Sequence, residues 1–237
     1  PLCVAYDLPF GCPGWLQGLI QADYFIKSGD AKKILVIGGE ILSRVSDPHD
    51  RDSMLYADGA GAVILEGRES SVPVGIIGHK TRSDTLNHAK MLFMGPSNNP
   101  DYPKKDEYFL KMFGRRLYQY ALEYVPSLIK LSLDEHKMDI KDVNKVLIHQ
   151  ANGKMDDAIL ERLFKLYDIP ATEIPEHTMP MTISWLGNTA VATLPTLWDL
   201  LMRKEIESNE ITPGKTIVFA SVGAGMNINT VIYKIPE

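Results

Sequence analysis

The stretch VNKVLIHQAN, residues 143–152, joins a short apolar run to a polar turn that begins with a histidine. Val143 to Ile148 predicts a strand, and His149 follows its last residue. The carboxyl ends of strands in an α/β sheet are where ligands and chemistry gather. His149 is therefore the first candidate functional residue, although an isolated histidine is more often structural. The remaining histidines lie in polar stretches and are expected to be solvated: His49, His79, His88, His136 and His177.

Around this stretch, strands and helices alternate along the chain. Trp15 to Ser28 carries apolar residues at the helical period, and Ile34 to Gly39 is an apolar run that predicts a buried strand. Further strands are predicted at 2–6, 58–65, 74–77, 216–220 and 230–233. Further helices are predicted at 108–133, 154–167 and 189–204, with an interruption of the first of these at Pro126. Alternating strands and helices predict an α/β fold with a layered sheet.

Composition restricts the class of protein. The 237 residues are 45% hydrophobic, which is enough for the core of one large domain or two small ones. A net charge of −5 argues against a nucleic-acid-binding protein, which needs a basic face. Apolar runs such as Ile34 to Ile37 are too short to cross a membrane, which takes about 20 residues. Cys3 and Cys12 make no disulfide framework, so a reducing cytoplasm is the simpler location.

Cys12 lies in FGCPGW, residues 10–15, between the first predicted strand and the first predicted helix. Pro13 suits the first position of that helix, because its missing N–H costs nothing there. We expect the helix N-terminus to lower the thiol pKa and to favour the nucleophilic thiolate. Free cysteines are commonly buried as small apolar residues, so the two roles are about equally favoured for Cys12 alone. Cys3, inside the predicted strand, is expected to be structural.

Asn188 lies in LGNTA, residues 186–190, just before a predicted helix. On its own it is expected to be an N-cap, for which Asn is among the best residues. Cys12, His149 and Asn188 have a joint use as well. A thiolate can hold an acyl group as a thioester, and an imidazole and a carboxamide can donate hydrogen bonds to an enolate or oxyanion. Further backbone donors are expected in the glycine turn formed by Gly223, Ala224 and Gly225.

Other interpretations fit parts of this pattern. The order Cys, His, Asn also occurs in papain-like hydrolases, but residues 150–152 and 187–189 do not carry their signatures. An acidic cluster suggests a metal site, yet a solvated acidic loop is favoured and no metal is expected at Asp47, His49, Asp50 and Asp52. The glycine turn lacks the third glycine of a dinucleotide fingerprint, so no such cofactor is expected there.

Five motifs occur in the order and approximate spacing of one known family: GCPG (11–14), YADGAGA (56–62), HQAN (149–152), GNT (187–189) and VGAG (222–225). On these motifs the chain resembles β-ketoacyl-acyl carrier protein synthase III, and HQAN with the downstream GNT is the specific part. The resemblance implies a thiolase-like layered fold, with the end of the N-terminal half and the complete C-terminal half. The expected division is 1–66 with the cysteine elbow, 67–105 as an irregular connection, and 106–237 as the C-terminal half. Family members carry on the order of 100 residues before the elbow, so we expect a missing upstream part, in a longer chain or a separate one.

The resemblance also implies a reaction. Cys12 would take an acyl group from acyl-coenzyme A, and His149 and Asn188 would stabilise the enolate formed when malonyl-acyl carrier protein loses CO2. The product would be a β-ketoacyl thioester that initiates fatty acid synthesis, made by a cytoplasmic homodimeric acyltransferase without a cofactor. Backbone amides at Cys12 and in the turn 223–225 would hold the oxyanion. The pantetheine arm or the carrier protein would contact Asn152, Lys154 and Arg115.

Some positions depart from the family pattern. Pro13 replaces a small residue, and Arg115 and Gln119 stand where many members have Asn and Lys. The segment 176–186 forms a longer loop before GNT than is common. Elongating synthases would place a second His, and thiolases a second Cys, at the position of Asn188, which therefore favours an initiating synthase. The alternatives are a starter ketosynthase of polyketide metabolism and a non-catalytic partner subunit, which would be expected to lose Cys12.

Overall fold

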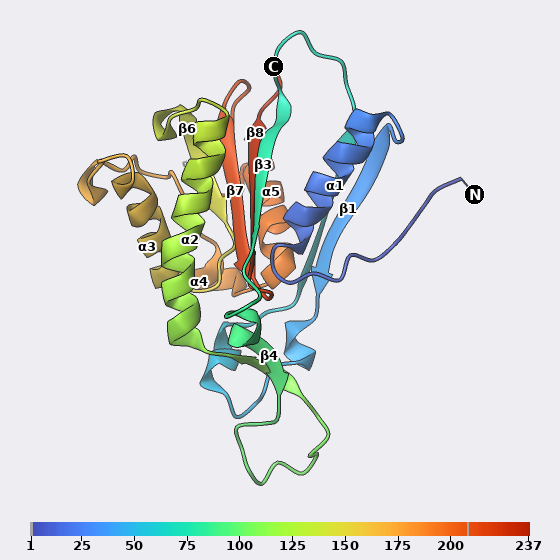
Figure 1. Ribbon diagram of the computed structural model, residues 1–237, viewed down its shortest axis with the longest axis vertical. Helices are drawn as coiled ribbons and strands as arrows, with labels where there is room; N and C mark the ends of the chain where they lie inside the picture. The colour runs from blue at the N-terminus through green and yellow to red at the C-terminus, as the bar shows by residue number, and fades with distance from the viewer. Residues whose placement is uncertain (1, 208) are drawn as a thin grey trace.

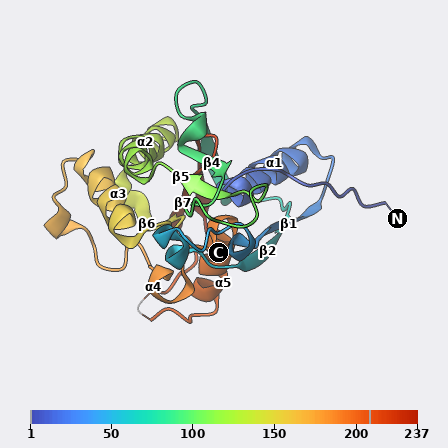
Figure 2. The same cartoon turned by 90° about the horizontal axis from the view of Figure 1, so that it is seen from below.

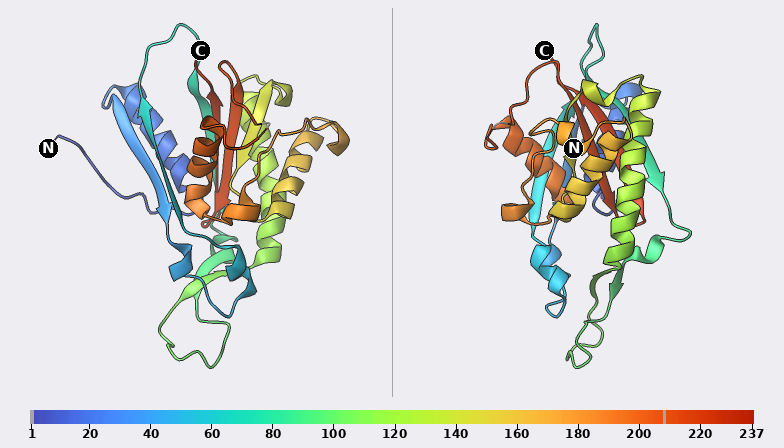
Figure 3. Two further views of the ribbon diagram at one scale, coloured as in Figure 1. Left: turned by 180° about the vertical axis from the view of Figure 1, so that it is seen from behind. Right: turned by 90° about the vertical axis from the view of Figure 1, so that its left-hand side faces the viewer.

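The computed structural model describes residues 2–207 and 209–237, and its centre is a four-stranded mixed sheet (Figure 1). The strand order is β3 (Gly75–Ser83), β8 (Asn227–Lys234), β7 (Thr216–Gly223) and β6 (Val143–Ile148). β6 and β7 are parallel, and the other neighbouring strands are antiparallel. The predicted α/β class is confirmed, because helices cover both faces of this sheet (Figure 3).

The alternation of side chains along β7 explains the two helical layers. Every residue of this strand is buried, as expected for a central strand covered on both faces. Val218, Ala220 and Val222 face the core formed with α2 (Gly114–Glu135) and α3 (Gly153–Lys165). Ile217 and Phe219 face the opposite core, formed with α1 (Gly14–Ser28) and α5 (Thr193–Met202).

A second, two-stranded sheet packs on α1 and α5. It pairs β1 (Lys33–Glu40) with β2 (Gly59–Glu66) in antiparallel register. Its inner face is close to the helices: a Cβ built at Gly61 would lie 2.7 Å from Pro195 Cβ. The outer face is apolar and open, since Leu35, Ile37 and Ile64 are 58%, 64% and 69% exposed.

Shorter elements connect these layers. A hairpin of β4 (Leu92–Gly95) and β5 (Phe109–Met112) precedes α2, and neither strand was predicted. Single turns of helix occur at α4 (Ile183–Leu186) and at the 3-10 segments Leu42–Arg44, Arg51–Leu55, Ala89–Met91, Ile140–Asp142, Ala171–Glu173 and Ala190–Ala192. Among the described residues, no helix has the length and apolar character that crossing a membrane requires.

Two sequence predictions in this region are wrong. Residues 2–6 form no strand, because no described segment pairs with their backbone; the segment runs outward from the rest of the molecule (Figure 2). Pro126 does not interrupt its helix, since α2 continues through it. The loss of one backbone hydrogen bond at a proline is local, and the buried side chains of Val125 and Ile129 hold both sides of it against the core.

The acidic loop is also not uniformly solvated. Asp47 is 1% exposed and forms an ion pair with the buried Lys111 of β5. Burial alone would raise the pKa of Asp47, but hydrogen bonds from the Lys111 ammonium and the Asn98 backbone N–H hold it far below its usual range. The loop is thereby fixed to the β4–β5 hairpin, while His49 stays exposed. Within the described residues, no group of three acidic, His or Cys side chains has the geometry of a metal site.

Candidate active site

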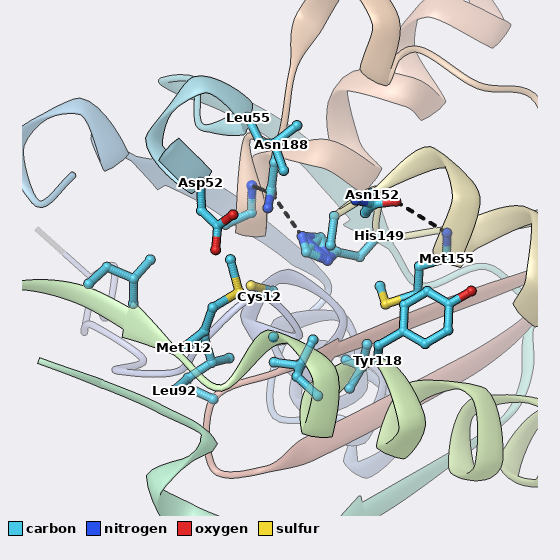
Figure 4. Close-up of a pocket in the computed structure, with 18 of the residues that line it drawn as sticks. Cys12, Asp52, Leu55, Leu92, Met112, Tyr118, His149, Asn152, Met155 and Asn188 are labelled. Carbon is cyan, nitrogen blue, oxygen red and sulfur yellow. Dashed lines mark hydrogen bonds between the residues drawn. The ribbon is translucent and has the colours of Figure 1, made fainter. Parts of the chain in front are cut away.

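A cavity of about 1100 Å³ is bordered by the ends of β1 and β6, the β4–β5 hairpin and helices α2 and α3, and Cys12, His149 and Asn188 all line it (Figure 4). Cys12 comes just before α1, His149 just after β6, and Asn188 from the segment after α4. The structure thus brings together three residues that are far apart in the sequence. Apolar side chains form much of the remaining wall, including Leu42, Leu55, Leu92, Leu110, Met112 and Val222.

Cys12 is placed by a tight turn against the glycine turn 223–225. The Gly14 N–H donates to the Gly11 carbonyl at 2.8 Å, and α1 begins at Gly14, so Pro13 is the cap and not the first helical residue. A Cβ built at Gly11 would lie 3.0 Å from the Ala224 nitrogen. A Cβ built at Gly223 would lie 2.8 Å from the Cys12 nitrogen. Only glycine permits this close approach of the two turns.

Two backbone amides at this junction are free to bind a ligand. In the described part of the chain, the N–H groups of Cys12 and Ala224 donate no hydrogen bond to another residue. Both residues line the cavity. Of the three predicted residues of the glycine turn, Ala224 faces the cavity, whereas Gly223 and Gly225 do not line it. An oxygen bound near the thiol would therefore meet the Cys12 and Ala224 donors.

The expected lowering of the Cys12 pKa is wrong. Burial of the thiol raises its pKa to about 12, and repulsion from the Glu40 carboxylate adds to this effect. The nearby backbone N–H of Cys12 acts in the opposite direction but more weakly. The sequence prediction considered the helix N-terminus and could not include burial of the thiol or, as a smaller effect, the carboxylate of a distant strand. Both favour the protonated thiol of Cys12.

His149 and Asn188 form a hydrogen-bonded pair. The His149 Nε2–H donates to Asn188 Oδ1 at 3.1 Å, and the Ala190 N–H donates to the same oxygen at 2.9 Å. Burial lowers the pKa of His149 to about 4, so the ring is neutral at physiological pH. With Nε2 protonated, Nδ1 carries the lone pair, and it is buried with no partner in the described residues. The imidazole can donate from Nε2 but is a weak base.

Asn188 is not the N-cap residue expected from the sequence, because Thr189 caps the turn Ala190–Ala192 and Ala192 caps α5. Its side-chain oxygen nevertheless accepts the Ala190 N–H, the first N–H of that turn. Its backbone N–H donates to the Leu55 carbonyl at 2.6 Å, and its carbonyl accepts from the Ala57 N–H at 3.0 Å. These bonds fix the residue to the segment that precedes β2. Its side-chain Nδ2 has no hydrogen-bond partner within the described residues.

Gln150 has a positioning role that the sequence did not reveal. The residue is fully buried, and its Oε1 accepts the N–H groups of Thr182 at 2.7 Å and Ile183 at 2.9 Å. Its Nε2 donates to the Pro180 carbonyl at 3.0 Å. The side chain therefore fixes the loop before Asn188 to the end of β6. This loop is the long segment noted in the sequence.

The three predicted carrier-binding residues lie in different settings. Asn152 and Arg115 line the cavity and are exposed. The Asn152 Oδ1 also accepts the Met155 N–H at 3.4 Å and so caps α3. Lys154 is exposed on the first turn of α3 but does not line the cavity. Their roles toward a carrier protein stay predictions.

Polar residues that were not predicted to belong to the site also line the cavity, among them Glu40, Asp52 and Tyr56. Figure 4 shows the Asp52 side chain on the same side of the cavity as Asn188. Partial burial and, to a smaller extent, the Asp58 carboxylate together raise the pKa of Glu40 to about 7. Burial also raises the pKa of Tyr56 above its usual range, with contributions from Asp52 and Asp50. Glu40 could have been identified as a candidate site residue from its position at the end of a predicted strand, because the same reasoning singled out His149.

The layered α/β fold and the cysteine in the turn just before α1 are features of the class of thiolase-like condensing enzymes. The model of the 3-oxoacyl-[acyl-carrier-protein] synthase III family matches residues 6–85, and the model of the C-terminal part of that family matches residues 133–235. The chain belongs to the 3-oxoacyl-[acyl-carrier-protein] synthase III family.

Individual relatives agree with this assignment. A β-ketoacyl-[acyl-carrier-protein] synthase III of Porphyra umbilicalis is 33% identical over 97% of this chain and 68% of its own length. The crystal structure of such a synthase from Thermus thermophilus has a TM-score of 0.81 at 27% identity, over 97% of this chain and 67% of that one. A priming β-ketosynthase of a polyketide biosynthetic pathway has a TM-score of 0.80 at 26% identity, over 98% of this chain and 66% of that one. The expected thiolase-like fold is confirmed.

Proposed function

We propose that this protein catalyses the decarboxylating Claisen condensation of a Cys12-bound acyl group with malonyl-acyl carrier protein, the initiating step of fatty acid synthesis. The observation that carries the proposal is the convergence of Cys12, His149 and Asn188 on one cavity in a member of this family. The free Cys12 and Ala224 amides support it, because acyl transfer develops an oxyanion. No metal or organic cofactor takes part in the proposed reaction.

In the first half-reaction, Cys12 Sγ attacks the thioester carbonyl of acyl-coenzyme A. The tetrahedral oxyanion accepts hydrogen bonds from the Cys12 and Ala224 N–H groups, and coenzyme A leaves as its thiol. The apolar wall that includes Leu92, Leu110 and Met112 suits a hydrocarbon acyl chain. The enzyme is left as an acyl-Cys12 thioester, with the acyl carbonyl next to the His149–Asn188 pair.

In the second half-reaction, malonyl-acyl carrier protein loses CO2 and becomes an enolate. The enolate oxygen accepts hydrogen bonds from His149 Nε2–H, in place of Asn188 Oδ1, and from Asn188 Nδ2. A neutral imidazole is suited to this task, since its Nε2–H donates a hydrogen bond to the enolate oxygen without transferring the proton. The enolate carbon then attacks acyl-Cys12, which releases the β-ketoacyl product and restores the thiol after protonation.

The proposal extends to partners and assembly. Arg115, Asn152 and Lys154 would meet the carrier protein and its pantetheine arm at the cavity rim. The protein would act in the cytoplasm as a homodimer. The open apolar face of Leu35, Ile37 and Ile64 supports association, because exposed apolar patches of this kind mark interaction surfaces. Sedimentation velocity of the protein tests this part.

The experiment that tests the reaction separates its two halves. Incubation with acetyl-coenzyme A should add one acetyl group to Cys12, measured by intact-mass spectrometry; no adduct with any acyl-coenzyme A would refute the proposal. Asn188→Ala should keep acylation but lose malonyl decarboxylation by about 10²-fold. Equal loss of both steps would assign Asn188 a structural role alone. Asn87→Ala, an exposed asparagine outside the cavity, is the matched control.

A priming ketosynthase of polyketide synthesis is the second candidate, favoured by the structural likeness to such an enzyme. Both candidates use the same chemistry at Cys12. They differ in the carrier protein that delivers the malonyl group, so condensation rates with purified carrier proteins of the two pathways distinguish them.

A further inference from the structure

The glycine turn that carries the Ala224 N–H is a three-residue loop between β7 and β8. Gly223 and Asn227 form the last backbone pair of these two strands, and residues 224–226 make up the loop between them. Gly225 has a φ of 140°, which is a conformation of glycine alone. With a glycine on each side, Ala224 has neighbours that restrict its backbone little. The loop therefore needs contacts from elsewhere to hold the Ala224 N–H in one place.

The side chain of Asn227 supplies such a contact. Its Nδ2 donates to the Ala224 carbonyl at 2.9 Å, and its Oδ1 accepts the Ser83 hydroxyl at 2.7 Å. A backbone carbonyl can only accept, so Nδ2 and not Oδ1 must face Ala224. The side chain folds back over the loop, because a Cβ built at Gly225 would overlap its amide. Asn227 thus bridges the loop and the end of β3.

The backbone holds the same loop against the end of β3. Ser83 and Asn227 are partners in the β3–β8 pairing, and the Asp84 N–H donates to the Met226 carbonyl at 2.8 Å. These contacts fix the side of the loop that faces β3. Within the described residues, Asn227 provides the side-chain hydrogen bond that reaches Ala224 itself.

The place of the Ala224 N–H matters for acyl transfer. It is one of the two free backbone donors beside the thiol, and it lies against the cysteine turn, since a Cβ built at Gly11 would lie 3.0 Å from the Ala224 nitrogen. Donors of this kind stabilise an oxyanion by preorganisation, because they must already stand where the charge develops. A bond that fixes Ala224 can therefore change the rate of acyl transfer without contact to the substrate.

We propose that Asn227 is a positioning residue for the oxyanion donor of Ala224. This inference rests on the proposed function, since it assigns a role within its acyl-transfer half-reaction. The Asn227 Nδ2 holds the Ala224 carbonyl, which restricts rotation about the backbone bonds of Ala224 and keeps its N–H directed at the acyl oxygen. Asn227 does not line the cavity, so its effect passes through Ala224.

The first test compares two reactions of the same thiol. Acylation of Cys12 by acetyl-coenzyme A develops an oxyanion, whereas alkylation of Cys12 by iodoacetamide does not. Asn227→Ala should lower the single-turnover acylation rate about tenfold, less than the loss of a whole donor, because Ala224 is displaced and not removed. The alkylation rate, followed at Cys12 by peptide mass spectrometry, should be unaltered. An unaltered acylation rate, or an equal loss of both rates, would overturn the proposal.

An isosteric variant separates hydrogen bonding from packing. At pH 8, Asn227→Asp keeps the shape of the side chain and an acceptor for Ser83, but it has no N–H for the Ala224 carbonyl. It should acylate at least as slowly as Asn227→Ala. An unaltered rate would show that the side chain acts by packing alone, which would overturn the proposal.

Asn144→Ala is the matched control. The Asn144 Oδ1 accepts the Thr216 N–H at 3.0 Å, at the opposite ends of β6 and β7 from the glycine turn. This variant also loses a hydrogen bond between an asparagine side chain and the backbone, but it should acylate at the unaltered rate. Acylation as slow as in Asn227→Ala would assign both effects to lost stability and overturn the proposal.

The second half-reaction provides a contrast with Asn188. Malonyl decarboxylation is assigned to His149 and Asn188, so folded Asn227→Ala should decarboxylate malonyl-acyl carrier protein at the unaltered rate. This pattern is the reverse of the one expected for Asn188→Ala. A tenfold loss of decarboxylation as well would mean a general distortion of the cavity and would overturn the proposal.

Two further outcomes are kept apart. If Asn227→Ala does not fold, Asn227→Asp and Ser83→Ala decide, because Ser83 is exposed and its removal frees the Asn227 amide; each should slow acylation but not alkylation. If no acyl-coenzyme A acylates Cys12 in the unaltered protein, the proposed function itself fails. Normal acylation in the folded Asn227 variants refutes only the present inference.

Discussion

The close approach of Gly223 to the cysteine turn gives the sharpest structural prediction. In Gly223→Ala, the new methyl group would lie 2.7 Å from Pro13 Cδ, 2.8 Å from the Cys12 nitrogen and 2.9 Å from Cys12 Cβ. These distances are below ordinary contact, and the atoms belong to a backbone and a proline ring. Neither neighbour can rotate away, so the two turns must move apart.

The size of the effect follows from this geometry. Forcing one extra methyl group into a packed region costs about 1–3 kcal/mol of stability. The larger effect falls on chemistry, because the movement separates the Cys12 and Ala224 N–H groups that would hold the oxyanion. A displacement of about 1 Å in such a site lowers a rate by about 10²-fold. We therefore expect a variant that folds but acylates poorly.

The assay compares stability and acylation in the same preparation. Urea unfolding measures the loss of stability, and the time course of the Cys12 adduct with acetyl-coenzyme A measures chemistry. Gly114→Ala is the control for replacing a glycine in the stability assay, since a methyl group added at Gly114 would meet no atom within 4 Å. Acylation of Gly223→Ala at the unaltered rate would show that the glycine turn does not position the cysteine turn.

Three further predictions follow from buried charges and from the second cysteine. Burial, aided by Asp157, raises the pKa of Asp156 to about 8, above its value of about 4 in the unfolded chain. Between these values the folded state binds a proton that the unfolded state has lost, so the stability of the folded state decreases as the pH rises from about 4 to about 8. Asp156→Asn should therefore be more stable by on the order of 2–5 kcal/mol at pH 8.5, a gap that narrows in urea unfolding at pH 5. Lys111→Ala leaves the buried Asp47 unpaired and should lower the free energy of unfolding by about 3–5 kcal/mol. Lys130→Ala, which removes the exposed pair with Asp134, should lower it by about 0.5 kcal/mol or less. Equal losses in urea unfolding would contradict this prediction. Cys3→Ser, at an exposed position, should acylate like the unaltered protein by intact mass, and a lost adduct would place the nucleophile at Cys3.

Much of the layered architecture could be predicted because its pattern is local. The apolar run that ends at His149 is a strand of the central sheet, as expected, and the helical period of Trp15–Ser28 corresponds to α1. The hairpin β4–β5 was missed because its strands are only four residues each: β4 was placed in an irregular connection, and β5 was wrongly included in the helix predicted at 108–133, which begins at Gly114. The strand predicted at 2–6 failed for the opposite reason, since an apolar run alone does not supply a pairing partner.

The candidate site divides in the same way. Cys12, His149 and Asn188 could be found because each lies in a distinctive short motif, and the structure places them on one cavity. The burial of Cys12 and the smaller effect of the Glu40 charge could not be found, because both arise from the packing of distant segments. The direction of the Cys12 pKa was therefore mispredicted from its own helix. The ion pair between the buried Asp47 and Lys111 is a second long-range contact that a local sequence pattern could not predict.

The distribution of the site along the chain has a consequence for its synthesis. Cys12 leaves the ribosome before His149, Asn188 and Ala224, which lie more than 100 residues further along the chain. Contacts between such distant segments form late and slowly in folding. A nascent chain therefore displays its thiol long before the amides and the imidazole that would use it are present. The proposed condensing chemistry would therefore begin only after Ala224 and the strands around it have been made and paired.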